Sequence, residues 1–401
     1  MEIKSRIVYI YANATKQYAS SVQQKITQQI GIANEMDYPV QGWFFTTEEL
    51  IEGDDETIRW FQVPKVESGY FQSLRQHAAN MRSVLRKVNE LDQPHYRYFM
   101  RFGICNSSLL RLSYLLRHRI VFNHLSVETD EYRLYQTDAH SQASRFLSKL
   151  EFKWLPIILD KTLGRIIRKN SKGAVVNSSE IAVRQQKQTL GKYHCEIIPD
   201  GVDVKRLPLL STKSLKDTIN MVFLKGASMD AHYNGLDRLM GGMLGYQGER
   251  NFSLTIIGNH TGAEQRMAAL LGMGSRVTFK QAIYGKALDA ELEKYELGVG
   301  PLAVHRKGIH ETSSIKTREY FGRGLPFFIA HPDKELSANS ELGKFYQEFE
   351  ANETAIDLEE LEGLFDRLNA VPDYPARMRE LAAQILDYRV KIPKWISFLT
   401  S

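Results

Sequence analysis

Short apolar runs separated by stretches of helical period fill the first half of the chain. Runs rich in β-branched and aromatic residues predict strands. They cover residues 7–11, 42–46, 96–102, 119–123 and 173–177. Between them, residues 18–30 and 72–89 carry apolar positions at helical spacing and predict helices. Strands that alternate with helices indicate a parallel sheet with crossover helices.

A second alternating series follows residues 205–216, whose irregular and polar sequence is typical of a linker. The strands predicted in this series cover residues 219–225, 253–257, 277–279, 297–300 and 327–330. Residues 357–388 predict further helix, and an apolar segment at 392–399 predicts a short terminal helix.

We therefore predict an α/β protein of two Rossmann-like domains that face each other across a cleft. The N-terminal domain covers residues 1–195, to which a terminal helix at about 386–401 returns, and the C-terminal domain covers 196–385. Open α/β sheets bind ligands beyond the carboxyl ends of their strands, so the cleft is the expected ligand site.

The composition, with 43% hydrophobic and 25% charged residues among 401, is that of an ordinary globular protein. The two cysteines, Cys105 and Cys195, are far apart, which makes a disulfide framework or a zinc site improbable. The N-terminus lacks the features of a signal peptide, and no apolar run has the length of a membrane span. We expect a cytoplasmic protein.

Two glutamates eight positions apart, Glu311 and Glu319, lie where the pattern predicts a junction between a strand and a helix. The helix is expected to end at Gly324-Leu325-Pro326, before the strand at 327–330. Eight positions correspond to about two helical turns, so the two carboxylates can reach opposite ends of one ligand.

Hydroxyl residues and cations surround the predicted start of this helix. Thr312, Ser313 and Ser314 are expected to cap its free backbone N–H groups. The start of a helix favours an anion, and a diphosphate suits it. Lys316 and Arg318 have the wrong sign for the helix dipole, a cost that a bound phosphate offsets.

This segment resembles the E-x7-E element of retaining glycosyltransferases with the GT-B architecture. Other segments resemble family 4 of these enzymes (glycosyl transferases group 1, the type that builds bacterial surface polysaccharides), in the same order. They are Gly173-Ala-Val-Val-Asn-Ser-Ser-Glu180, Ile197-Ile-Pro-Asp-Gly-Val-Asp203, Leu254-Thr-Ile-Ile-Gly258 and Val277-Thr-Phe279. The resemblance covers about residues 170–335.

The resemblance implies roles for particular residues. Glu311 would contact hydroxyls of the transferred sugar, and Glu319 would accept hydrogen bonds from the nucleotide ribose. The other residues expected to bind the nucleotide sugar are Thr312, Ser313, Ser314, Lys316, Lys225, Gly258 and Ile283. His124 would present its ring to the donor sugar and, with Glu311, form the catalytic pair. Asn13 and Glu128 would lie on the acceptor side.

Two departures from the family pattern weaken this assignment. The family carries an Arg and a Lys that bind the diphosphate, and here Ala227 and Asn234 stand at those positions. A leaving diphosphate needs positive charge, for which we favour Lys316. The other available cations are Lys225, His232, Arg306 and Lys307. The glycine-rich loop after the first strand is also missing, and residues 11–16 replace it.

The implied activity is transfer of a sugar, with retention of configuration, from a nucleotide-diphosphate sugar to a hydroxyl of a glycan or lipid-linked glycan. The enzyme would need no metal and no cofactor besides its donor substrate, a UDP- or GDP-sugar. One alternative is a non-catalytic sugar-nucleotide-binding component of a polysaccharide complex, and another is a sugar-nucleotide epimerase with the same architecture.

The basic excess lies in the first 200 residues, where 27 Lys and Arg face 21 Asp and Glu. Residues 144–172 combine many of these cations with apolar and aromatic residues, a mixture that binds anionic lipid at the inner face of a plasma membrane. The alternative is a solvated helix face. Nucleic-acid binding is not expected, since no recognised module accompanies the charge.

Overall fold

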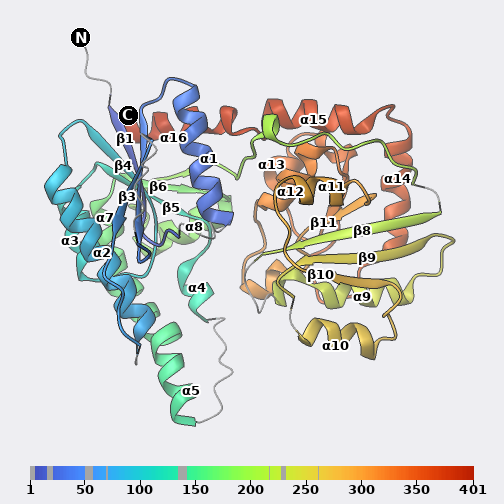
Figure 1. Cartoon of the computed structure of the whole chain (residues 1–401), viewed down its shortest axis with the longest axis horizontal. Coiled ribbons are helices and arrows are strands. Elements are labelled where there is room, and N and C mark those ends of the chain that lie inside the picture. Colours follow the sequence, from blue (N-terminus) through green and yellow to red (C-terminus); the bar gives the residue numbers. More distant parts are fainter. Residues whose placement is uncertain are drawn as a thin grey trace. The chain divides into compact units, whose positions relative to one another are not determined.

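The structure is a computed structural model that describes residues 5–15, 21–49, 57–68, 71–133, 142–215, 217–226, 232–260 and 262–401. The chain forms two compact units (Figure 1). Unit 1 comprises Met1–Ile198 and Lys391–Ser401, and unit 2 comprises Pro199–Val390. The sequence predicts two domains with boundaries after residues 195 and 385.

Unit 1 contains a parallel sheet in the order β3-β2-β1-β4-β5-β6-β7. The strands are β1 (Arg6–Tyr11), β2 (Val40–Thr46), β3 (Ile58–Gln62), β4 (Tyr96–Arg101), β5 (Ile120–His124), β6 (Gly173–Val176) and β7 (Cys195–Ile197). Every residue of β2 and β6 is buried. Helices that cover both faces of a parallel sheet explain why these strands are continuous apolar runs.

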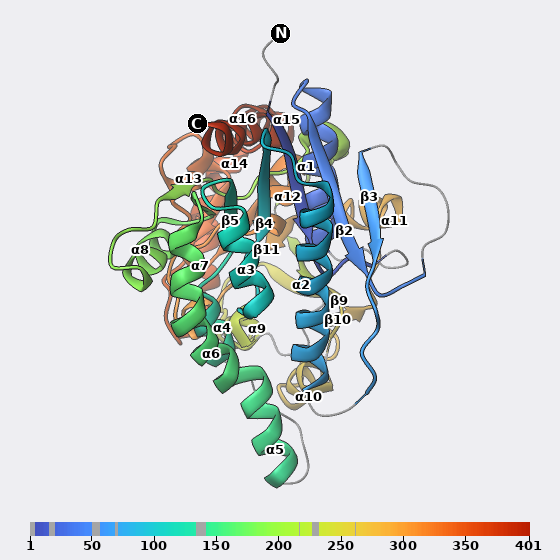
Figure 2. The same cartoon turned by 90° about the vertical axis from the view of Figure 1, so that its left-hand side faces the viewer.

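The helices of unit 1 include one long run with two irregular turns. They are α1 (Ser21–Glu35), α2 (Gln72–Leu91), α3 (Ser107–Leu115), α4 (Glu128–Arg133), α5 (Gln142–Lys149), α6 (Leu155–Leu159), α7 (Arg165–Asn170) and α8 (Ser179–Gln188). The π-helical turns Leu150–Trp154 and Asp160–Gly164 join α5, α6 and α7 end to end (Figure 2).

The expected return of the C-terminal helix to the first domain is confirmed. Most of α16 (Tyr388–Thr400) belongs to unit 1. Trp395 stacks on Phe99 of β4 with ring centres 5.2 Å apart, and the Lys172 ammonium donates to the Leu399 carbonyl at 3.2 Å.

Unit 2 contains a second parallel sheet, in the order β10-β9-β8-β11-β12-β13. Its strands are β8 (Thr218–Lys225), β9 (Asn251–Gly258), β10 (Val277–Lys280), β11 (Leu297–Val299), β12 (Phe327–Ile329) and β13 (Tyr346–Glu348). Its helices are α9 (Leu236–Gly245), α10 (Gly262–Leu270), α11 (Lys286–Leu292), α12 (Ile315–Arg323), α13 (Lys334–Ser337), α14 (Leu361–Asn369) and α15 (Tyr374–Ile385). Its 3₁₀ turns include Val304–Lys307 and His232–Asn234.

Both sheets follow the Rossmann strand order 3-2-1-4-5-6, so the predicted α/β class with two Rossmann-like domains is confirmed. The predicted linker at 205–216 is wrong for its described residues, 205–215. They belong to unit 2, and Leu210 and Leu215 are buried in its core. The edge strands β3 and β13 were not predicted, because they are short and partly polar. In the described residues, no helix is long and apolar enough to cross a membrane.

Candidate functional site

The predicted ligand residues of unit 2 gather at its topological switch point, between β8 and β11. In sheets of this order, ligands bind beyond the carboxyl ends of the strands where the strand order reverses. Lys225 is the last residue of β8, and residues 300–314 connect β11 to α12. The loop that carries Glu311 and the start of α12 therefore follow a strand adjacent to β8.

The start of α12 is where the sequence predicts it, but the expected capping is wrong. Ser314 occupies the N-cap position, and its side chain makes no capping hydrogen bond. The Ser313 hydroxyl accepts a hydrogen bond from the Asp200 backbone N–H at 2.8 Å. Within the described part of the chain, the N-cap side chain thus leaves the first-turn amides uncapped, and the positive end of the helix dipole is available to an anion.

Three lysines lie around this helix start. The Lys316 ammonium is 3.9 Å from the centre of the Phe223 ring, and no ion pair of Lys316 is found in the described part of the chain. Its removal from water, with the charges of Lys307 and Lys225, lowers the pKa of Lys316 to about 7. A bound anion would relieve the repulsion between Lys316 and the other two lysines. Strongly perturbed pKa values of this kind are typical of functional sites.

The other two lysines have partners. Lys225 donates to both carboxylate oxygens of Glu264, at 2.7 and 2.8 Å. The Lys307 ammonium lies 3.6 Å from the centre of the Tyr233 ring. Glu264 neutralises part of the positive charge around the start of α12. The sequence does not predict this role of Glu264, because 39 residues separate it from Lys225 and no spacing rule connects the two.

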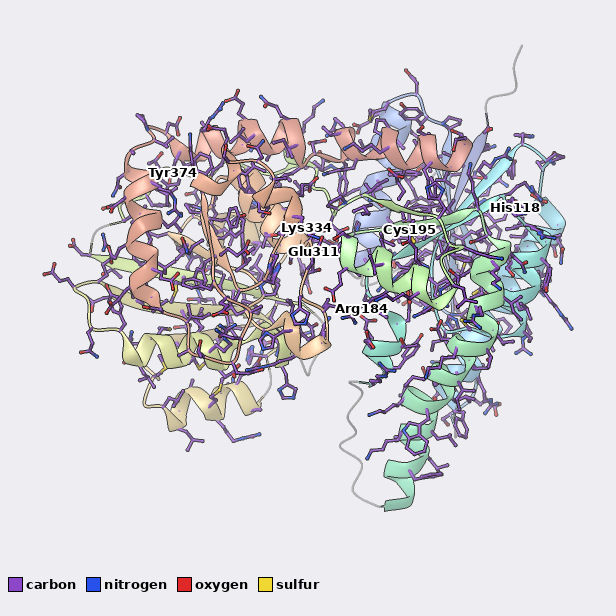
Figure 3. All side chains as sticks on the ribbon, turned by 180° about the vertical axis from the view of Figure 1, so that it is seen from behind. His118, Arg184, Cys195, Glu311, Lys334 and Tyr374 are labelled. Carbon is purple, nitrogen blue, oxygen red and sulfur yellow. The ribbon has the colours of Figure 1, made fainter. Side chains whose placement is uncertain are left out.

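The two glutamates of the motif have different surroundings. Glu311 is buried in the loop before α12 and forms an ion pair with the exposed Lys334 at 2.9 Å (Figure 3). Glu319, in the second turn of α12, is partly exposed. Burial raises the pKa of Glu319, and the nearby Asp289 raises it further while Arg323 opposes both. A partly buried carboxylate of this kind is stabilised when hydroxyl groups donate hydrogen bonds to it.

A buried guanidinium holds α12 in place. Arg318 donates to both Asp333 oxygens, at 2.6 and 2.9 Å, and to the Asp200 carbonyl at 3.2 Å. Its side chain is inaccessible to water. The Pro-Asp-Gly turn that prompted the family resemblance is thus bound to α12 through the Asp200 backbone, by Ser313 and Arg318.

The rest of this turn is fixed by packing. At Gly201, a Cβ atom would lie 2.8 Å from the Tyr388 ring. Asp203 accepts from Arg389 at 2.9 Å. The motif therefore has a structural reason within unit 2, apart from any ligand.

The predicted base-side residues also have packing roles. Gly258 ends β9 with φ +131°, and a Cβ atom there would lie 2.1 Å from the Lys225 carbonyl oxygen, so only glycine fits. Ile283 packs against the core of unit 2 from the loop after β10. Their contact with a nucleotide base stays a prediction.

In unit 1, His124 lies at the end of β5, where its ring is fully buried. Its Nδ1 is 2.5 Å from Glu128 Oε1, and its Nε2 is 3.2 Å from the Tyr193 hydroxyl. Glu128 also accepts from Gln185 at 2.8 Å and from Arg168 at 3.4 Å. Burial opposes the charge of Glu128, but His124 and Arg168 lower its pKa to about 2.

A sugar contact by His124 therefore stays a prediction that requires Glu128 or Tyr193 to release the ring. The acceptor-side roles of Glu128 and Asn13 likewise stay predictions. Asn13 is exposed, and its side-chain oxygen accepts from Asn80 at 2.7 Å. Among the described residues, no group of three or more His, Cys, Asp or Glu is placed to hold a metal ion.

The chain matches no protein-family model, and no curated protein matches it. Solved structures do resemble it. Sucrose-phosphate synthase from Thermosynechococcus elongatus is 13% identical, with 98% of both chains covered and a TM-score of 0.64. WaaG, a glycosyltransferase involved in lipopolysaccharide biosynthesis, is 14% identical, with 98% of this chain and 100% of that one covered and a TM-score of 0.63. HepE from Anabaena, in complex with UDP and glucose, is 12% identical over 98% of both chains, with a TM-score of 0.58.

The chain has the GT-B fold. At these identities the likeness establishes the fold alone, and it agrees with the architecture that the sequence predicts. The GT-B fold accounts for the two Rossmann-ordered sheets and for the terminal helix that returns to unit 1.

We predict that Arg318→Leu lowers the free energy of unfolding of unit 2 by about 3–5 kcal/mol, because Asp333 then stays buried without its partner. Urea unfolding followed by circular dichroism measures the loss. The double variant Arg318→Leu/Asp333→Leu should recover a large part of it, since both charges are removed together.

The matched control is Arg377→Leu, which breaks a half-exposed ion pair with Glu380 and should leave stability nearly unchanged. Equal losses for Arg318→Leu and Arg377→Leu would contradict the anchoring role of Arg318.

Proposed function

We propose that this protein is a retaining glycosyltransferase that moves a sugar from a nucleotide-diphosphate sugar to a hydroxyl of a glycan or lipid-linked glycan. The observation that carries the proposal is the uncapped start of α12, with Lys316 beside it and the charges of Lys307 and Lys225 nearby. A helix start without an N-cap hydrogen bond, and with several lysines around it, fits a diphosphate.

The residues of α12 and its loop would divide the donor between them. The first-turn amides and Lys316 would bind the diphosphate. Glu319 would accept hydrogen bonds from the two ribose hydroxyls. These hydroxyls would replace the water that the Glu319 carboxylate loses through its partial burial. Glu311, which is paired with Lys334, would accept hydrogen bonds from hydroxyls of the transferred sugar.

The bond from the sugar to the β-phosphate oxygen would break as the acceptor oxygen bonds to the same carbon, on the same face of the ring. The departing phosphate oxygen would take the acceptor's proton. Negative charge grows on the diphosphate in this step, and Lys316 with the α12 amides would stabilise it in the transition state. Because these cations are supplied by the chain, we propose a metal-independent reaction.

Two structural neighbours support the choice of substrate class. HepE is described in complex with UDP-glucose, and WaaG as a glycosyltransferase of lipopolysaccharide biosynthesis. For this chain we propose a UDP- or GDP-sugar donor and an acceptor in surface polysaccharide synthesis. A lipid-linked acceptor would place the protein on the inner face of the plasma membrane.

A second candidate is a sugar-nucleotide-binding component without catalysis. The pairing of Lys225 with Glu264 favours it, because that lysine is partly neutralised in a site that already lacks the family's Arg and Lys. Such a protein would bind the nucleotide sugar but would neither transfer nor hydrolyse the sugar. The other alternative, a sugar-nucleotide epimerase, would convert the donor in the absence of an acceptor.

We predict that one nucleoside diphosphate among UDP, GDP, TDP and ADP stabilises the protein against thermal unfolding. At a hundred times its dissociation constant it should add about 2.7 kcal/mol. Glu319→Ala and Lys316→Ala should lose most of this gain, because they remove the ribose acceptor and the phosphate cation.

The matched controls are Glu359→Ala and Lys286→Ala, which change exposed residues elsewhere in unit 2 and should keep the full stabilisation. Stabilisation that survives in Glu319→Ala and Lys316→Ala would place the nucleotide away from α12 and contradict the proposal.

We also predict that affinity for the diphosphate falls as the pH rises above 7. The free protein loses the Lys316 proton near pH 7, whereas a bound diphosphate favours the charged ammonium, so binding takes up a proton. Affinity should fall up to about tenfold per pH unit between pH 7 and 9, where the phosphate itself is already ionised.

Isothermal titration at pH 7, 8 and 9 measures this dependence. Lys316→Met should bind more weakly at pH 7 and show little dependence on pH. A wild-type affinity that is constant from pH 7 to 9 would show that Lys316 does not touch the diphosphate.

A further inference from the structure

One outer face of the run α5–α7 presents only apolar and basic side chains, apart from one threonine. The exposed residues of this run with described side chains are Phe146, Lys149, Trp154, Ile158, Lys161, Thr162, Arg165, Ile166 and Lys169. Phe146, Trp154 and Ile158 each keep more than half of their surface in water, at 57%, 52% and 55%. We call this set the outer stripe.

The two acidic residues of the same segment have partners within unit 1. Glu151 accepts a hydrogen bond from the Ser73 backbone N–H at 2.9 Å. Asp160 is buried and accepts from Arg168 at 2.8 Å. Both acids thus have partners in unit 1, and among the described residues no acid forms an ion pair with a cation of the outer stripe.

The inner side of the run is firmly packed, so the outer stripe is a formed surface. Arg168 is buried, donates to Gln185 at 2.9 Å and lies 4.4 Å from the centre of the Phe102 ring. At Gly164, a Cβ atom would lie 2.7 Å from Asp160 Oδ1. The π-helical turn that contains Gly164 and Asp160 therefore brings the backbone close to the ion pair of Asp160 with Arg168.

Helix α3, which lies beside α7 in Figure 2, extends the same chemistry. Tyr114 and Leu115 at its end are exposed, Tyr114 at 56%, together with Arg111 and Arg117. Exposed apolar side chains that gather on one face mark an interaction surface.

We propose that the outer stripe and the end of α3 bind the surface of an anionic lipid bilayer. Aromatic and aliphatic side chains enter the boundary between headgroups and acyl chains, while lysines and arginines pair with the anionic headgroups. The inference deepens the proposed function, on which its purpose rests: the surface would hold the enzyme at a lipid-linked acceptor.

The composition favours a bilayer over the other possible partners. A second copy of the chain, joined face to face, would bring like charges together, which is unfavourable. Nucleic acid would pair with the cations but offers no apolar layer to Ile158 and Ile166. Apolar and basic side chains alternate along the outer stripe. This pattern fits a bilayer, whose headgroups are charged and whose acyl chains beneath them are apolar.

The test is sedimentation of the full-length protein with vesicles of phosphatidylcholine, with and without phosphatidylglycerol. We expect binding to the anionic vesicles only, weakened by salt. Lys161→Glu/Lys169→Glu should weaken binding by about 25-fold or more, since each basic residue contributes about fivefold. Trp154→Ser/Ile158→Ser should weaken it by at least about tenfold.

The fluorescence of Trp154 reports directly on insertion. Anionic vesicles should shift the emission of the wild type to shorter wavelength, and Trp154→Phe should bind but lose most of the shift. Leu270→Ser and Lys286→Glu are matched controls on exposed positions of unit 2, and they should bind vesicles as the wild type does.

Several results would overturn the proposal. They are the absence of vesicle binding, binding that is unchanged in the stripe variants, tighter binding to an RNA oligomer than to vesicles, and self-association that the stripe variants abolish. The stripe variants should keep their stabilisation by nucleoside diphosphate. If the wild type binds no nucleoside diphosphate, the proposed function is contradicted. The vesicle experiments still test the membrane surface on their own.

Discussion

The buried pair between Arg318 and Asp333 is the interaction on which the candidate site depends. Placing two charges in the interior is costly unless the geometry satisfies both, and here the guanidinium meets both carboxylate oxygens and the Asp200 carbonyl. Since Arg318 lies one turn into α12, the pair holds this end of the helix against Asp333 and the Asp200 carbonyl. The position of the first-turn amides, of Lys316 and of Glu319 follows from it.

The two units use buried charge differently. In unit 2, the acids compensate Arg318 fully, while Lys316 lies against an aromatic ring without an anionic partner in the described residues. In unit 1, His124, Glu128, Arg168 and Asp160 form one buried network in which both signs are represented. Incomplete compensation is what a ligand can relieve, so the site in unit 2 is the stronger candidate for binding an anion.

Local patterns predicted what depends on neighbours in sequence. The strands β1, β2 and β8 are apolar runs, and the end of α12 at Gly324, where φ is +77°, follows from a glycine before Leu325-Pro326. The edge strand β13 could not be predicted, because two of its three residues, Gln347 and Glu348, are polar and it forms no apolar run.

Contacts between distant residues were beyond the sequence. Nothing in the spacing pairs Lys225 with Glu264, or Glu311 with Lys334, and the burial of His124 follows from Phe102 and Tyr193, which pack on its ring from other elements. The charge of residues 144–172 was visible in the sequence. Only the fold shows that Asp160 is buried with Arg168 and that Glu151 is bound to the start of α2, apart from the cations of the outer stripe.

The most direct test of the central claim is a crystal structure of the protein with the nucleoside diphosphate that stabilises it best. We expect the diphosphate at the start of α12, within hydrogen-bond distance of Lys316 and the first-turn amides, and the ribose hydroxyls on Glu319. A nucleotide bound elsewhere, with Lys316 still against Phe223 and Glu319 without a ligand, would contradict it.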